Sequence, residues 1–222
     1  MNILLRGAVC VSLLALVAGC CANNANNCDD LYVDSLYLVL ANNKANADTV
    51  TTSFTRAELD TVYLQRYTPA RAAIPANGAI PAIPAQPEGP YSDPVSIVRA
   101  QQTTTNSALK RKLGDAKLSP ATTIVISNTT PFAPSTTGGK LSAYNYVLTV
   151  QDRSVKPRRS YVFKLENIIL QGQYEADGCT TCYENTKKTF RLTGRNTRII
   201  DVTESGTGTN KVPVPVAVSK LD

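Results

Sequence analysis

The chain has 222 residues and a formal net charge of +6, and it contains no histidine and no tryptophan. Because imidazole is missing, the sequence excludes a Ser-His-Asp triad, a Cys-His dyad and histidine metal ligands. Paired carboxylates could still divide acid and base roles, but no spacing among the 17 Asp and Glu residues nominates a catalytic pair. We therefore predict a protein that is not an enzyme and that needs neither a metal nor a cofactor.

The basic residues form short clusters that are far apart in the chain. A nucleic-acid-binding domain usually gathers its basic residues on one face. The scattered clusters instead predict solvated surface and no nucleic-acid partner. The clusters are Lys110-Arg111-Lys112, Lys156 with Arg158 and Arg159, and Lys187 and Lys188 with Arg191.

Residues 1–19 have the features of a signal peptide. Arg6 precedes an apolar run that is shorter than the roughly 20 residues of a membrane-spanning helix, and the run ends in small residues. The segment Val17-Ala18-Gly19-Cys20 resembles the lipobox of bacterial lipoprotein precursors. This resemblance implies that Cys20 receives diacylglycerol and becomes the mature N-terminus, which leaves 203 residues with a net charge of +5. The alternative is an ordinary secretory signal that contains a cysteine.

Residues 20–30 are polar and lack periodicity, which predicts a flexible tether between the lipid and a folded domain. Position 21 is Cys and not the aspartate that retains enterobacterial-type lipoproteins at the inner membrane, so the resemblance implies the outer membrane. Cys28-Asp29-Asp30 is similar to the acidic export signal of bacteroidete-type surface lipoproteins, although it lies further from Cys20. The sequence therefore leaves open whether the protein faces the periplasm or the cell surface.

Residues 31–222 are expected to form one domain made mostly of β-strands. Runs of β-branched and aromatic residues alternate with turn signals, and no βαβ alternation is present. The pattern favours an all-β fold, a β-sandwich of immunoglobulin-like or related topology, with a small β-barrel as the alternative. The expected strands are 31–40, 51–54, 61–67, 95–100, 122–127, 144–150, 160–174, 187–193, 197–203 and 211–219.

Several local features refine this prediction. Thr55 and Glu58 match a capping box, so a one-turn helix over 55–59 is the alternative to a plain connection. The 107–113 run predicts a second helix. In the 160–174 strand the apolar pattern changes phase near Asn167, which predicts a β-bulge. Gly194-Arg195-Asn196 predicts a hairpin turn.

The last expected strand carries Pro213 and Pro215, two residues apart. Both missing N–H donors then fall on one side of the strand. That side must be a free edge of its sheet.

Residues 69–94 form a break in composition, with the sequence Ala-Ile-Pro repeated three times. Proline lacks a ladder donor and restricts the residue before it, which predicts a long irregular loop with polyproline II character. Loops of this length are either functional or mobile. The alternatives are a recognition element and a plain insertion.

The pair Cys179 and Cys182 should lie at the tip of a long hairpin. A redox Cys-x-x-Cys needs a following helix, and a zinc site needs four ligands, and neither requirement is met nearby. A local disulfide between Cys179 and Cys182 in an oxidising envelope is the preferred interpretation. With Cys20 lipidated, three pairings of the remaining mature cysteines stay open.

Three Asp-Ser/Thr-apolar triplets resemble the motif that bacteroidete-type bacteria glycosylate. Surface turns are the alternative explanation. The triplets are Asp34-Ser35-Leu36, Asp48-Thr49-Val50 and Asp60-Thr61-Val62.

Together these features predict a non-catalytic, lipid-anchored envelope protein with a binding or scaffolding role at the outer membrane. Its expected partners are the membrane, through the anchor, and an envelope protein or glycan. A carbohydrate-binding module and a carboxylate-based envelope enzyme are the alternative functions.

Overall fold

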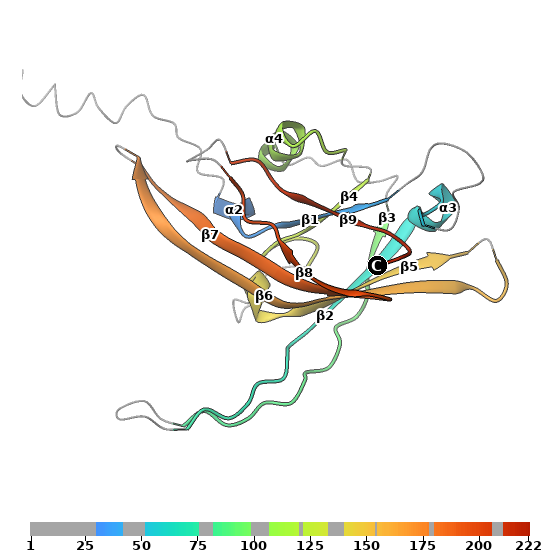
Figure 1. The fold of residues 1–222 in the computed structure, drawn as a ribbon, viewed down its shortest axis with the longest axis horizontal. Helices are drawn as coiled ribbons and strands as arrows, with labels where there is room; N and C mark the ends of the chain where they lie inside the picture. Colours follow the sequence, from blue (N-terminus) through green and yellow to red (C-terminus); the bar gives the residue numbers. More distant parts are fainter. Residues whose placement is uncertain are drawn as a thin grey trace, which may run out of the picture.

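The computed structural model describes residues 30–41, 52–75, 82–98, 107–119, 122–132, 140–153, 155–177, 180–205 and 211–222. Within them the chain forms two β-sheets, of three and six strands, that pack face to face and do not close into a barrel (Figure 1). The predicted all-β sandwich is therefore confirmed. The signal peptide over 1–19, Cys20 and nearly all of the predicted tether lie outside the described residues.

The smaller sheet has the strand order β4-β1-β9. Strand β1 (Leu36–Leu40) is its centre, antiparallel to β4 (Thr123–Ile126) and parallel to β9 (Pro215–Val218). Strand β9 pairs with β1 alone among the described strands. The edge position predicted from the two prolines is thus confirmed.

The larger sheet is antiparallel throughout, in the order β3-β2-β5-β6-β7-β8. Strands β6 and β7 form a long hairpin that pairs from Lys164 with Thr193 to Asp177 with Thr180. The strands are β2 (Thr61–Tyr67), β3 (Val95–Val98), β5 (Asn145–Asp152), β6 (Arg159–Asp177), β7 (Thr180–Thr193) and β8 (Thr197–Asp201).

The main core lies between the two sheets. Alternate residues of each strand point inward, so Val62 and Leu64 of β2 face Leu38 of β1, and all three are fully buried. A second, smaller cluster covers the outer face of the small sheet, where Tyr37 packs with Leu113. The helices of this layer are α2 (Asp30–Val33) and α4 (Ser107–Asp115).

Two predictions near the start of the domain are wrong. The expected strand over 31–40 begins only at Leu36, because residues from Asp30 to Val33 form helix α2, whose Val33 carbonyl accepts a hydrogen bond from Asn185 (2.8 Å). This tertiary contact overrides the β propensity of the segment. Of the expected strand over 51–54, the described residues 52–54 form only a single bridge, in which Phe54 N donates to the Ala41 carbonyl (2.8 Å).

The local signals in the middle of the chain were more reliable. Thr55 and Glu58 form both hydrogen bonds of the capping box, and helix α3 (Arg56–Leu59) follows. Asn167 has a φ of 52° at a register shift between Glu166 and Ile169, which is the predicted bulge. The turn at 194–196 joins β7 and β8 as predicted.

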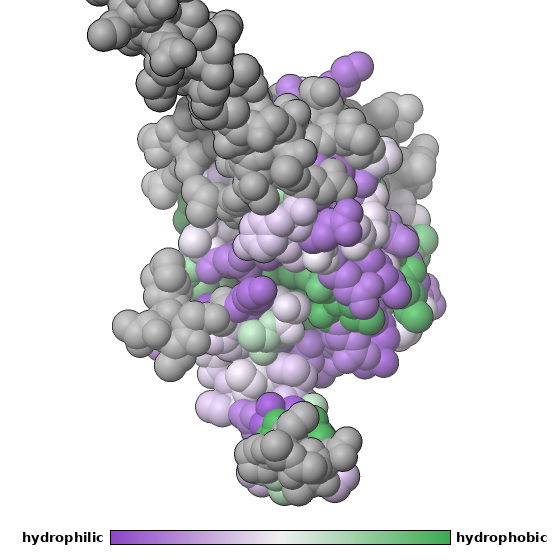
Figure 2. All heavy atoms as spheres, turned by 90° about the vertical axis from the view of Figure 1, so that its left-hand side faces the viewer, coloured by the Kyte–Doolittle hydropathy of each residue, from purple (hydrophilic) through white to green (hydrophobic). Residues whose placement is uncertain are grey.

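The proline-rich segment is more regular than predicted. Arg71 and Gln86 exchange both of their backbone hydrogen bonds, and Ile74 and Ile83 do the same. The described parts of residues 68–90 thereby form a narrow two-stranded arm that projects from the body (Figures 1 and 2). Prolines did exclude a continuous ladder, but isolated bridges need only the non-proline residues between them. We call the described residues 68–75 and 82–90 the arm.

Candidate functional site

The predicted site residues are largely beyond the described part of the chain. Cys20 and Cys179 lie outside it. Cys182 is half-buried near the end of the β6–β7 hairpin and is not a free thiol, and its pairing with Cys179 stays a prediction. Among the described residues, no three His, Cys, Asp or Glu side chains are grouped as metal ligands would be. The helices in this part of the chain are also too short and too polar to cross a bilayer.

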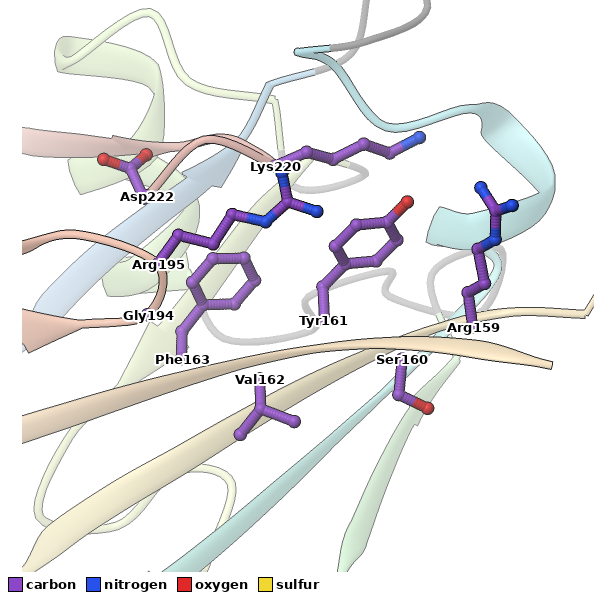
Figure 3. A pocket seen from close by; sticks show the side chains of 9 residues that line it. All are labelled: Arg159, Ser160, Tyr161, Val162, Phe163, Gly194, Arg195, Lys220 and Asp222. Atoms are coloured by element: carbon purple, nitrogen blue, oxygen red, sulfur yellow. The ribbon is translucent and has the colours of Figure 1, made fainter.

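A cavity of about 500 Å³ lies at the end of the sandwich where β6 begins (Figure 3). Residues 159, 161 and 163 alternate along β6, so Arg159, Tyr161 and Phe163 project from the same face of the sheet into the cavity. The β7–β8 turn adds Arg195, and the segment after β9 adds Lys220. We call this the cationic pocket, and its lining residues are Arg159, Ser160, Tyr161, Val162, Phe163, Gly194, Arg195, Lys220 and Asp222.

Two of the charges that line the cationic pocket are already neutralised. Lys220 is buried, and its Nζ lies 2.8 Å from Glu58 Oε2 and 5.2 Å from the centre of the Tyr161 ring. The Asp222 carboxylate lies 2.9 Å from Arg198 and accepts hydrogen bonds from Ser219. Arg159 and Arg195 are exposed and have no ion-pair partner among the described residues. The pocket therefore carries a surplus of positive charge.

A buried charge cluster lies at a different place, where α2 and the segments that follow β8 and precede β9 meet β7. Lys188 is 1% exposed, and its Nζ donates to Glu204 Oε1 (2.9 Å) and to the Ser35 carbonyl (3.2 Å). Burial lowers the pKa of Lys188, and the nearby Glu204 carboxylate opposes this shift. The buried Lys188 ammonium would therefore destabilise the fold if it lost its ion pair with Glu204.

Further polar contacts extend the buried charge cluster. Asn185 donates to Asp34 Oδ1 (3.0 Å), and Lys211 pairs with Glu184 (2.8 Å). Two positions in the basic clusters, Lys112 and Lys188, are therefore not the solvated surface that we predicted. Lys188 is in phase with the buried Phe190 of β7, and a register shift between Lys187 and Asn185 turns Asn185 to the same face although the two are three residues apart.

The first of the three glycosylation-like triplets is also not a surface turn. Ser35 is 1% exposed beneath the buried charge cluster, and Asp34 is 8% exposed. The folded protein does not present this serine to an enzyme. Thr61 begins β2 and is half-buried, and residues 48–50 lie outside the described residues.

A third polar site, besides the cationic pocket and the buried charge cluster, lies at Tyr67 on the outer side of the large sheet. Its hydroxyl donates to Glu166 Oε1 (3.2 Å), and its ring packs against Tyr91. Burial, followed by the charge of Glu166, raises the pKa of Tyr67 to about 12. Because the folded-state pKa exceeds the unfolded value near 10, the stability that this group contributes is complete below about pH 10 and is lost as the pH rises through about 12.

We predict that Tyr67→Phe makes the free energy of unfolding fall less steeply between about pH 10 and pH 12. At neutral pH the variant should lose about 0.5–1.5 kcal/mol, the value of one hydrogen bond. Urea unfolding at a series of pH values measures both effects. The control is Tyr91→Phe, on a side chain that is 46% exposed, and a slope equally reduced in both variants would contradict the assignment.

No family model, no curated protein and no solved structure matches the chain. Function is therefore inferred from the residues and their geometry alone. Sequence reasoning missed the cationic pocket, because its three segments meet only after β6, β7 and the residues following β9 have packed. The available signal was weak: Arg159 was one of three basic residues in a short run, and Arg195 was assigned only to a turn.

Proposed function

We propose that this protein is a non-catalytic, lipid-anchored component of the outer membrane that binds a partner in the envelope through the arm. The arm is the observation that carries the proposal. It extends away from both sheets and is held by its own backbone hydrogen bonds (Figure 1). Residues 70–75 are all exposed, and Ile74 remains 48% exposed.

The order of the arm needs a physical explanation, because its residues bury little surface against the body. Fixing each backbone residue costs about 1–2 kcal/mol in conformational entropy, and burial in the body offsets little of that cost here. Prolines reduce the cost, because their φ is fixed before folding. A pre-ordered, extended and apolar segment suits recognition, because little further entropy is lost when a partner binds it.

The root of the arm is fixed to the large sheet. Gly89 N donates to the Thr68 carbonyl (2.9 Å), and Ser92 N donates to the Arg66 carbonyl (2.8 Å). The Arg66 guanidinium in turn lies 4.5 Å from the centre of the Tyr144 ring. These contacts give the arm a defined direction relative to the body, which supports presentation to a partner.

The proposed anchor limits where the domain can lie. Residues 20–29 can span at most about 35 Å when fully extended. Helix α2, which begins at Asp30, must then stay near the lipid surface. A projecting arm would extend the reach of the protein toward other envelope components.

The buried carboxylates support a non-catalytic role. Glu58 faces Lys220, Glu184 faces Lys211 and Glu204 faces Lys188, each within 3 Å. Such pairs hold segments together, and these three carboxylates are occupied by lysines, which supports a structural role for them. The exposed Tyr91 packs against Tyr67 of β2, just after the arm, and the exposed Tyr174 packs against Tyr183 on the β6–β7 hairpin. They therefore favour separate packing roles over one flat sugar-binding platform.

We predict that the arm is dispensable for folding and required for binding. Replacing residues 72–85 by Asn-Gly keeps the Arg71–Gln86 bridge, and changes in loop length cost only about 0.6 kcal/mol per doubling. The unfolding midpoint in urea should therefore stay nearly constant. Loss of cooperative unfolding in this variant would contradict the prediction.

A photo-crosslinking amino acid at position 74, introduced into the full-length protein in its native envelope, tests the binding role. We expect one discrete crosslinked species. The matched control is the same amino acid at Ile199, which is 81% exposed on β8. Absence of a crosslink at position 74, or the same species from position 199, would refute the proposal.

A further inference from the structure

We infer that the cationic pocket is a binding site for an acidic sugar, with the phosphate or carboxylate of the ligand between Arg159 and Arg195. This site is separate from the arm, and it goes beyond the proposed function. The inference stands on the convergence of unpaired cations, a free hydroxyl and an aromatic wall in one cavity (Figure 3).

The two arginines provide the charge. Exposed cations are commonly unpaired, so the lack of an acidic partner alone says little. What distinguishes Arg159 and Arg195 is that they come from different elements and flank the same side chain, Tyr161. Guanidinium groups match the geometry of carboxylate and phosphate oxygens, with which they form paired hydrogen bonds.

Tyr161 provides a third donor. Its ring is fixed by an edge contact with Phe54 (centroids 5.6 Å apart) and by Lys220 above it. In Figure 3 its hydroxyl points away from β6 into the cavity, and it has no hydrogen-bond partner in the described part of the chain. A rigid ring with a free hydroxyl is suited to contact a polar ligand without loss of side-chain entropy.

The cavity is larger than an isolated anion needs. A volume of about 500 Å³ is within the range of pockets for small ligands, roughly 300–1,000 Å³. Gly194 lets the β7–β8 turn approach the wall of the cavity closely, since a Cβ there would lie 3.0 Å from Phe163 Cδ1 and 2.5 Å from the Asp222 carbonyl oxygen. The remaining space beside Tyr161 accommodates a sugar ring attached to the anionic group.

The position of the pocket favours a soluble or polymer-borne sugar over a headgroup of the anchoring bilayer. Asn185 of β7 contacts α2, where the tether would enter. Gly194, in the pocket, follows Asn185 by nine residues along the same strand and turn, which corresponds to about 30 Å. The pocket is therefore held at the end of the sandwich remote from the tether.

Calorimetry with the full-length protein tests the inference, with glucose 6-phosphate and glucuronic acid as probes and glucose and inorganic phosphate as references. We expect both acidic sugars to bind, more tightly than either reference, and less tightly as salt is raised. Arg195→Gln and Arg159→Gln should each weaken binding about tenfold or more. Tyr161→Phe, which keeps the ring, should weaken it by a smaller factor.

The matched control is Arg158→Gln, which removes the same charge from an exposed neighbour that does not line the pocket. It should bind as the unmodified protein does. Equal losses in Arg158→Gln and Arg195→Gln, binding of glucose as tight as that of glucose 6-phosphate, or no binding of either acidic sugar would overturn the inference.

Sedimentation with vesicles separates the sugar from a lipid headgroup. The full-length Cys20→Ala variant is mixed with vesicles of phosphatidylcholine alone or in equal parts with phosphatidylglycerol. We expect Arg195→Gln, introduced into this variant, to leave binding to both kinds of vesicle unchanged. Binding to the anionic vesicles that Arg195→Gln removes, together with no binding of soluble acidic sugars, would assign the pocket to the membrane surface and refute the proposal.

Discussion

Replacing Glu204 with glutamine is expected to lower the free energy of unfolding by about 3–5 kcal/mol, because it leaves the Lys188 ammonium buried without its ion-pair partner and with only the more distant charge of Asp34 opposite it. Lys188 is 1% exposed, and its remaining partner is the Ser35 carbonyl at 3.2 Å. Desolvation is the main cause of its lowered pKa, and the glutamate that opposes this shift would be gone. Urea unfolding at neutral pH measures the loss.

The pH dependence of this variant follows from the same pair. When the folded-state pKa of a lysine is lowered, the folded protein binds fewer protons than the unfolded chain between the folded-state pKa and about 10.4. Stability then rises with pH through that window. Glu204→Gln should lower the pKa of Lys188 further and extend the rising region to lower pH.

Two further variants separate a buried pair from an exposed one. Arg198→Gln breaks a pair with Asp222 in which the arginine is 46% exposed, and it should cost about 0–1 kcal/mol. Lys188→Met combined with Glu204→Leu removes both buried charges, and it should restore much of the loss. If Glu204→Gln costs no more than Arg198→Gln, the buried charge cluster does not stabilise the fold as described.

Gly172→Ala is expected to destabilise the protein by about 1–3 kcal/mol, the usual cost of overpacking. A Cβ at this position would lie 2.3 Å from the Glu184 carbonyl oxygen and 2.6 Å from the Tyr183 ring. Gly172 lies at a register shift in the β6–β7 pairing, where the two backbones approach closely. The clash would open the hairpin next to the buried charge cluster.

Gly114→Ala is the matched control, because a Cβ there would meet nothing within 4 Å. Gly114 lies in helix α4, where alanine is favoured over glycine by about 0.5–1 kcal/mol. We therefore expect the two glycine substitutions to change the urea midpoint in opposite directions. A loss of stability in both variants, or in neither, would contradict the contacts assigned to Gly172.

Much of the fold could be predicted from local pattern. The 61–67 strand was assigned with the bounds of β2, the phase change near Asn167 marked a real bulge, and the two prolines placed β9 at an edge. Each of these signals depends on residues within one strand or turn. They survive folding because the side-chain period and the missing proline donors act locally.

The errors concern features that only tertiary contacts create. Helix α2 forms in a β-rich segment because its Val33 carbonyl is bound by Asn185, which lies far along the chain. The sequence predicts that Lys112 and Lys188 are surface residues, yet the packing of α2, α4 and β7 buries them. The cationic pocket joins three segments in the same way. A local sequence pattern contains no information on which distant segments make tertiary contacts.

The lipid anchor is the central claim of the proposed function, and mass spectrometry of the N-terminal peptide of protein isolated from membranes tests it most directly. Several acyl chains anchor firmly, since each buried CH₂ contributes roughly 0.8 kcal/mol. The account predicts a mature chain that begins at Cys20 and carries diacylglycerol on its sulfur, in the unmodified protein and in the control Cys21→Ala. A mature chain that begins elsewhere, or a Cys20 without lipid, would contradict it.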